Sequence, residues 1–163
     1  MILGVVSDTH NRASHIEKII DIFNSNKVDC VVHTGDITQA KSLKKFCRLN
    51  STLIGVYGNN DLHEKGLEET SLEYGFNFQN PPLVTNIGGR KIAILHEPDE
   101  IKELIENETN LDLILHGHTH RYRFEDINGV KIFNPGECAG ILEGKNSVGL
   151  VYLHNLRIRR VFF

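Results

Sequence analysis

Short apolar runs alternate with longer amphipathic segments over the first two-thirds of the chain. Residues 2–6 (ILGVV), 29–33 (DCVVH) and 52–58 (TLIGVYG) have the continuous apolar character of buried strands. Residues 90–96 (RKIAILH) and 112–117 (DLILHG) repeat this character further along the chain. The pattern therefore predicts five strands that are covered on both faces.

The segments between these strands are typical of helices. Apolar side chains recur at helical spacing in residues 14–26, 40–50 and 99–108. Ser14 and Glu17 have the spacing of a capping box at the start of the first helix. Asp99 is a suitable cap for the third helix. We therefore expect strand–helix alternation in this part of the chain.

The last third of the chain has the pattern of antiparallel strands. Residues 123–134 (RFEDINGVKIFN) predict a hairpin that turns at Asn128-Gly129, and residues 148–163 predict a second one. A chain that begins with strand–helix alternation and ends in hairpins predicts a mixed sheet arrangement. The expected fold is α/β, an α/β sandwich of two mixed β-sheets flanked by helices.

Composition and charge narrow the classes of function. The chain is 40% hydrophobic and 24% charged, as soluble globular proteins are. Its 163 residues hold no repeat or linker, so we expect a single domain over residues 1–163. A formal net charge of −3 argues against binding to long nucleic acid or an anionic membrane. Without a C-x-x-C pair or a signal peptide, a reducing, cytoplasmic location is expected.

Each of the five predicted strands ends in polar side chains with ligand chemistry. They are Asp8 and His10, then Asp36, then Asn59, Asn60 and Asp61, then His96, and finally His118 and His120. Any one of them alone is more simply a turn residue, a helix cap or a polar strand end. Ligands bind at the carboxyl ends of strands in α/β sheets, so parallel neighbouring strands would bring these groups to one edge.

The chemistry of this set indicates metal ions. Apart from Asn60 and Asp61, the set has two carboxylates, four imidazoles and one amide oxygen, and such a mixed nitrogen and oxygen set suits Mn, Ni, Fe, Co or Zn. The set is too large for one tetrahedral zinc but suits two ions about 3.5–4 Å apart that share a bridge such as Asp36. The positive charge of two divalent ions exceeds the negative charge of two carboxylates, so the site favours an anionic substrate such as a phosphate ester.

These motifs, in this order, resemble those of the calcineurin-like metallophosphoesterase family. They are SDTH at 7–10, TGDI at 34–37, YGNND at 57–61, LH at 95–96 and HGHTH at 116–120. The NPGE at 134–137 is similar to the family's late N-P-G turn, so the resemblance covers nearly the whole chain. The small size and the GNND and NPGECAG segments look most like the compact archaeal and bacterial phosphodiesterase branch.

The resemblance implies two divalent ions held by seven side chains. The first ion would be bound by Asp8, His10, Asp36 and His120, and the second by Asp36, Asn59, His96 and His118. Asp36 would bridge the ions together with a water or hydroxide, and the metal-bridging hydroxide would attack phosphorus in line. His116 and His33 have no place in the motifs, so both are expected to be buried strand residues.

The resemblance also suggests three catalytic residues. Asp61 would orient its neighbours, and His10 would take part in proton transfer. Asn60 stands where many family members have histidine, and it can donate a hydrogen bond but cannot act as a general acid. We therefore expect a preference for good leaving groups over alkyl phosphomonoesters. His63 lies nearby in the sequence and is expected either to replace Asn60 as the general acid or to be an ordinary solvated loop residue.

The expected function is that of a two-metal phosphodiesterase acting on a small or nucleotide-like substrate. The alternatives are a phosphomonoesterase and a non-catalytic protein-binding scaffold of the same fold; the filled ligand set favours an enzyme. Glu97 follows His96 at a position where the family commonly has glycine. Its carboxylate is expected to be an extra metal ligand, a group that repels the substrate phosphate, or a side chain that points into solvent. Loops 62–80 and 138–147 carry no motif that identifies the substrate. A homodimer or homotetramer could form through an exposed strand edge or through the apolar C-terminus RVFF at 160–163.

Overall fold

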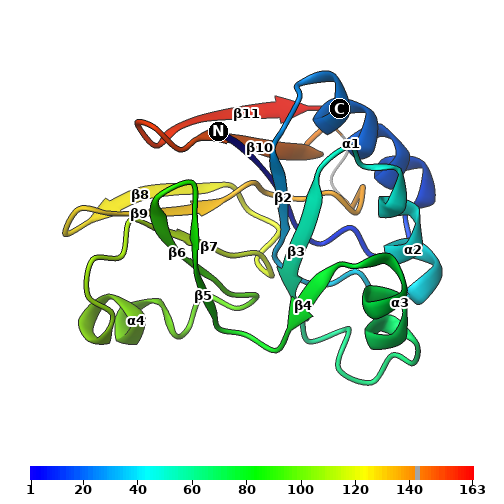
Figure 1. Ribbon diagram of the computed structural model, residues 1–163, viewed down its shortest axis with the longest axis horizontal. Coiled ribbons are helices and arrows are strands. Elements are labelled where there is room, and N and C mark those ends of the chain that lie inside the picture. The colour runs from blue at the N-terminus through cyan, green and yellow to red at the C-terminus, as the bar shows by residue number, and fades with distance from the viewer. Residues whose placement is uncertain (142–143) are drawn as a thin grey trace.

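The computed structural model describes residues 1–141 and 144–163, whose strands form two sheets (Figure 1). The first sheet contains, in spatial order, β11 (Arg157–Phe162), β10 (Ser147–Tyr152), β1 (Ile2–Val6), β2 (Cys30–His33), β3 (Thr52–Val56) and β4 (Asn77–Gln79). The second contains β5 (Leu83–Ile87), β6 (Arg90–Ile94), β7 (Leu113–Leu115), β9 (Val130–Asn134) and β8 (Arg123–Ile127). Both are mixed: β1 to β4 run parallel, as do β6, β7 and β9, whereas β10, β11, β5 and β8 pair antiparallel.

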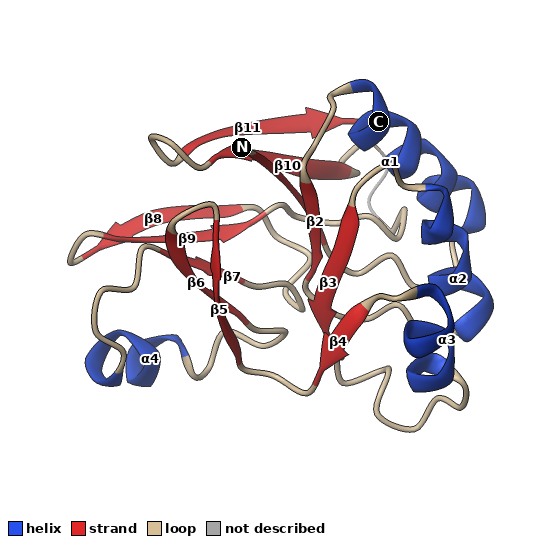
Figure 2. Cartoon of the chain, viewed as in Figure 1, coloured by secondary structure: helices blue, strands red, loops and turns tan. Residues whose placement is uncertain are grey.

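Helices cover the outer face of each sheet, as Figure 2 shows. The helices are α1 (Ala13–Ser25), α2 (Ala40–Lys45), α3 (Leu67–Tyr74) and α4 (Ile101–Asn107), with a 3₁₀ turn at Phe46–Arg48. The first three pack on the first sheet, and α4 packs on the second. None of the helices in the described ranges is long and apolar enough to cross a membrane.

Three apolar clusters connect these layers. Leu3 of β1, Ile92 of β6 and Phe133 of β9 meet between the two sheets and are fully buried. Val31 faces the helices of the first sheet, and Ala93 faces α4. Because both faces of the central strands are covered, those strands are apolar without interruption. The predicted α/β sandwich of two mixed sheets flanked by helices is confirmed.

The five strands with polar ends belong to two different sheets. β1, β2 and β3 lie in the first sheet, whereas β6 and β7 lie in the second. The expectation of a single sheet edge is therefore wrong in its geometry. Contacts join the two sets of ends directly: Nδ1 of His96, after β6, lies 2.9 Å from the Thr34 carbonyl after β2. The polar groups converge where the ends of the two sheets meet.

Both predicted helix caps are wrong. α1 begins at Ala13 without a side-chain capping bond, and Glu17 instead forms an ion pair with Lys45 of α2 at 2.8 Å. α4 begins at Ile101, and Asp99 makes no capping bond to it. α2 ends at Lys45, earlier than the amphipathic pattern suggests, and continues as the 3₁₀ turn.

The loops without a motif contain further elements. Residues 62–80 hold α3 and β4, and the pattern did not predict β4 or β5. β4 is short, and β5 mixes buried with half-buried positions, so neither has a strong apolar signal. Within loop 138–147, residues 142 and 143 lie outside the described residues.

Candidate metal centre

Most of the candidate ligands sit on unusual backbone. Asp8, His10, Asp36, His118 and His120 all have positive φ, between 43° and 64°. Residues other than glycine are uncommon in this region, and such strain is concentrated at functional sites, where the surrounding structure holds it in place. The tight turns after the strands thus direct five of the seven predicted ligands toward a common point.

Asp8, His10 and His120 form the first group, with ligand atoms that lie within 4.8 Å of one another. Oδ2 of Asp8 accepts hydrogen bonds from the Ser7 hydroxyl and, at 3.1 Å, from the backbone N–H of His118. Oδ1 lies 3.5 Å from Nε2 of His120 and has no hydrogen-bond partner within the described ranges. The rings of His10 and His120 stack at 5.5 Å between centroids.

The environment of Asp8 fits a cation. Its side chain is fully buried, and burial raises the pKa of the Asp8 carboxyl above its usual value, although the Ser7 hydrogen bond acts in the opposite direction. A buried carboxylate oxygen without a donor costs about 1–3 kcal/mol or more. A divalent ion next to Oδ1 would remove that cost and favour the ionised form.

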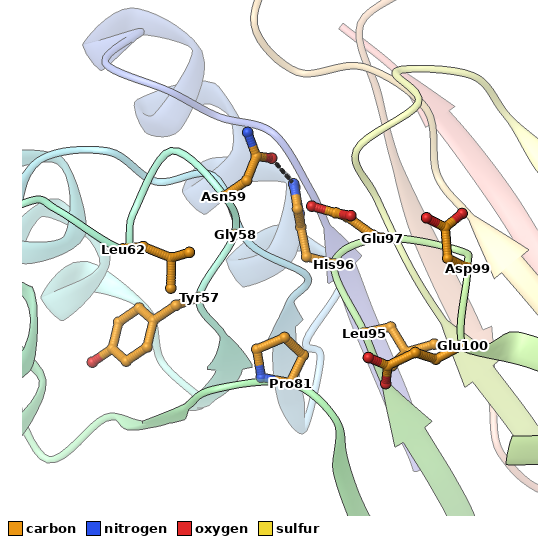
Figure 3. Close-up of a pocket in the computed structure, with 10 residues that line it drawn as sticks. All are labelled: Tyr57, Gly58, Asn59, Leu62, Pro81, Leu95, His96, Glu97, Asp99 and Glu100. Atoms are coloured by element: carbon orange, nitrogen blue, oxygen red, sulfur yellow. Dashed lines mark hydrogen bonds between the residues drawn. The ribbon is translucent and has the colours of Figure 1, made fainter. Parts of the chain in front are cut away.

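Asn59, His96 and His118 form the second group, part of which Figure 3 shows. Oδ1 of Asn59 lies 2.9 Å from Nε2 of His96 and 3.1 Å from Nδ1 of His118, and the two ring nitrogens are 3.3 Å apart. With metal–ligand bonds of about 2.0–2.2 Å, neighbouring ligands of one ion lie about 3.0–3.5 Å apart. The three atoms therefore have the spacing of ligands to a shared ion.

A backbone carbonyl sets the orientation of His96. Its Nδ1 donates a hydrogen bond to the Thr34 carbonyl at 2.9 Å, which directs Nε2 toward the site. Histidines that bind metals usually donate from the other ring nitrogen in this way, because the bond fixes both tautomer and ring orientation. The bond to Thr34 thus leaves Nε2 of His96 facing Oδ1 of Asn59, in the orientation that a metal ligand needs.

Asp36 lies between the two groups. Its Oδ2 is 3.9 Å from Nε2 of His10, and its Oδ1 is 3.4 Å from Nε2 of His96. Asn60 donates to it twice, from Nδ2 to Oδ2 at 2.7 Å and from its backbone N–H to Oδ1 at 3.0 Å. Burial acts to raise the pKa of Asp36, but the bonds from His96 and Asn60 outweigh burial and hold the pKa well below its usual value. The two oxygens of Asp36 therefore face one group each.

Asp61 holds the backbone under this site. Its Oδ2 accepts the N–H groups of Gly58 and Asp36, both at 2.8 Å. Its Oδ1 accepts those of Ile37 at 2.9 Å and Thr38 at 2.7 Å. One buried carboxylate therefore joins the loop after β2 to the loop after β3. Both oxygens of Asp61 are occupied by backbone N–H groups, which suits the orienting role that the family resemblance implies.

Glycines allow the loops to approach this closely. A Cβ on Gly117 would lie 1.8 Å from Oγ of Ser7, and one on Gly58 would lie 2.2 Å from Oδ1 of Asp36. Both distances are far below van der Waals contact, so a side chain at either position would displace the Asp8 or the Asp36 loop.

Five of the nine histidines lie outside both groups, and three of these, His33, His63 and His116, are close to the motifs in the sequence. Nδ1 of His116 donates to the Gly117 carbonyl at 3.1 Å, and His63 is exposed. His33 accepts the Gly35 N–H on Nδ1 at 3.1 Å, so its Nε2 carries the proton and donates to Thr9 Oγ1 at 3.0 Å. His116 and His33 are both buried.

We expect the buried His33 to make the metal-free protein sensitive to acid. Burial lowers the pKa of His33 from 6.5 to about 3. Below pH 6.5 the unfolded chain gains a proton that the folded chain excludes, so this contribution to stability is complete above that pH and is lost toward pH 3. Between about pH 7.5 and pH 5 the wild type should lose about 2 kcal/mol more than His33→Gln.

Urea unfolding in chelator at several pH values tests this expectation. His63→Gln, which changes an exposed loop histidine, is the matched control and should follow the wild type. A parallel pH dependence of wild type and His33→Gln would contradict it.

The sequence motifs did not single out Glu137 as a functional residue. Its Oε2 lies 3.5 Å from Nδ1 of His120, and its side chain is buried. A carboxylate behind a ligand histidine commonly fixes the ring and raises its basicity. In the sequence, Glu137 is only the acidic residue that ends NPGE, a position that the pattern assigns to a turn.

Comparisons with known proteins agree with this geometry. Residues 1–156 match the family model of the calcineurin-like phosphoesterase superfamily domain. A phosphodiesterase of Methanocaldococcus jannaschii is 32% identical over 99% of this chain and 98% of its own length. The solved structure of an archaeal phosphodiesterase covers 100% of both chains with a TM-score of 0.91 and 32% identity. Vps29 of Entamoeba histolytica, solved with Zn²⁺, covers 99% of both chains with a TM-score of 0.70, but its 19% identity shows likeness of fold alone.

Proposed function

The chain belongs to the calcineurin-like phosphoesterase superfamily, and from this premise we propose that it hydrolyses a small phosphodiester with two divalent metal ions. The position of Asp36 carries the proposal, because its two oxygens face the two groups of candidate ligands. The likeness to an archaeal phosphodiesterase over the whole chain supports a diester as the substrate.

The two groups would each hold one ion. Asp8, His10, Asp36 and His120 would bind the first, and Asp36, Asn59, His96 and His118 the second. The unpartnered Oδ1 of Asp8 and the spacing around Asn59 support this assignment. Without sulfur ligands the set suits Mn, Ni, Fe, Co or Zn. When bound, the ions would supply an activated water and positive charge for the phosphoryl oxygens.

The protein's own groups would position this chemistry. Asp61 would keep the Asp36 loop in place, and His10, which is partly exposed, would exchange protons with solvent. Asn60 uses its amide to hold Asp36, so it offers no acid for the leaving group. The preferred substrate is therefore an ester whose leaving group is stable as an anion and departs without being protonated.

We also propose a small substrate, a reducing location and a single domain. The net charge of −3 does not favour long nucleic acid. Cys30, Cys47 and Cys138 are free thiols, which suits the cytoplasm. The apolar cluster shared by both sheets supports one domain over residues 1–163.

Hydrolysis of bis-p-nitrophenyl phosphate beside p-nitrophenyl phosphate tests the proposal. Protein stripped with chelator should be inactive, and manganese or nickel should restore diester cleavage that exceeds monoester cleavage by at least about tenfold. Faster monoester cleavage would indicate the phosphomonoesterase instead. Two bound ions without turnover would indicate the non-catalytic scaffold.

A further inference from the structure

A cavity of about 320 Å³ opens directly beside the second ligand group. Asn59 and His96 form part of its lining, so it is continuous with the candidate metal centre. Figure 3 shows Tyr57, Leu62 and Pro81 around the same space. An aromatic ring, an aliphatic side chain and a proline ring make an apolar wall. A cavity of this size is at the lower end of those that hold small organic ligands, about 300–1,000 Å³.

Three carboxylates form the other side of the cavity. Glu97, Asp99 and Glu100 line it, and all three are exposed. In Figure 3 the Glu97 carboxylate points toward the Asn59–His96 pair. Among the described residues that line the cavity, none is lysine or arginine. This side of the cavity therefore carries negative charge that no lysine or arginine of the lining offsets, next to the candidate metal centre.

We propose that this cavity binds one organic substituent of the phosphodiester and selects a substituent that is uncharged or cationic. The inference rests on the proposed function. A phosphoryl group held between the two ligand groups has the cavity on the side of Asn59 and His96, where one of its ester substituents can enter. A flat, apolar substituent would pack on Tyr57 and Pro81.

The acidic side explains why the substituent cannot be anionic. A second phosphate or a carboxylate in the cavity would face Glu97, Asp99 and Glu100 without a cation to pair with. A cationic substituent would instead be attracted to the same three carboxylates. Exposed pairs of charges are weak, about two- to fivefold in affinity each, but three of them act on one substituent here.

Competition with symmetric diesters tests the inference, because either substituent then carries the same charge. Diphenyl phosphate, bis(2-aminoethyl) phosphate and bis(2-carboxyethyl) phosphate would be titrated as inhibitors of bis-p-nitrophenyl phosphate hydrolysis by the manganese-loaded enzyme. The bis(2-carboxyethyl) ester should bind at least about tenfold more weakly than the bis(2-aminoethyl) ester. Glu97→Gln/Asp99→Asn/Glu100→Gln should reduce this ratio to about threefold or less, and 0.5 M salt should reduce it in the wild type.

A matched variant removes the same charge elsewhere. Glu73→Gln/Glu103→Gln/Glu106→Gln changes three exposed carboxylates that do not line the cavity, and it should keep the wild-type ratio. Equal ratios in both triple variants would overturn the inference. Loss of metal from the cavity variant would also overturn it, because Glu97 would then act as a metal ligand. Absence of bis-p-nitrophenyl phosphate turnover in the wild type would instead contradict the proposed function itself.

Discussion

Asp36→Asn should lower the rate of phosphodiester hydrolysis at least about 1,000-fold, because loss of the bridging carboxylate affects both ions. Removal of a group that only supports a metal ligand typically costs about 10–100-fold in metal affinity or activity. Asp36 faces His10 with one oxygen and His96 with the other. An amide keeps only one oxygen and places an NH₂ group where the second ligand atom was. The amide also loses the negative charge that offsets two divalent ions.

The measurement is the number of ions per chain after dialysis, taken together with turnover of bis-p-nitrophenyl phosphate. We expect two ions in the wild type and at most one in Asp36→Asn. Asp126→Asn, which changes an exposed carboxylate of the β8–β9 hairpin, should behave as wild type. Two tightly bound ions in Asp36→Asn would contradict the bridging role, and thermal unfolding in chelator would show whether the variant is folded.

The chemistry of the site could be predicted from the sequence because it depends on local patterns. Asp8, Asp36 and His96 come one to four positions after an apolar run, and a strand that ends in a polar turn is visible in a short window of residues. Their number and ligand chemistry predicted a metal centre, and the structure brings them together. The residues that hold a site by packing or hydrogen bonding have no such signature.

The arrangement in space could not be predicted in the same way. Whether β3 and β6 belong to one sheet depends on contacts between distant segments, and the strand pattern is the same in either case. The role of Glu137 depends on its distance to His120, 17 positions earlier in the chain. The caps at Ser14 and Asp99 failed for the opposite reason: the local signal was present, but Glu17 pairs with α2 and α4 begins after Glu100.

Likeness of fold alone does not decide the function of this chain. The chain shares its fold with Vps29 at a TM-score of 0.70, as well as with an archaeal phosphodiesterase at 0.91. Function has to be argued from the site that the fold carries. In this chain the buried Oδ1 of Asp8 has no hydrogen-bond partner among the described residues, and the two oxygens of Asp36 face the two groups of candidate ligands.

The second large effect that we expect is the loss of about 3–5 kcal/mol of folding stability in Asp61→Ala. The Asp61 carboxylate accepts backbone N–H groups from Gly58, Asp36, Ile37 and Thr38. Each buried N–H left without a partner costs about 1–3 kcal/mol, and water that enters the space of the side chain offsets part of the total. Asp61→Asn should not rescue the loss, because its NH₂ group would face two of these donors.

Urea unfolding of the metal-free variants gives the stability, and metal titration of the folded variants gives the second readout. Asp126→Ala is the matched control, since this carboxylate also accepts a backbone N–H, from Gly129 at 2.9 Å, but lies in an exposed hairpin. It should cost less than about 1 kcal/mol, because water replaces the lost bond. A similarly small cost for Asp61→Ala would mean that the loops after β2 and β3 hold their positions without it. A large cost together with at least about tenfold weaker metal binding would show that Asp61 stabilises the fold and the Asp36 position through the same four bonds.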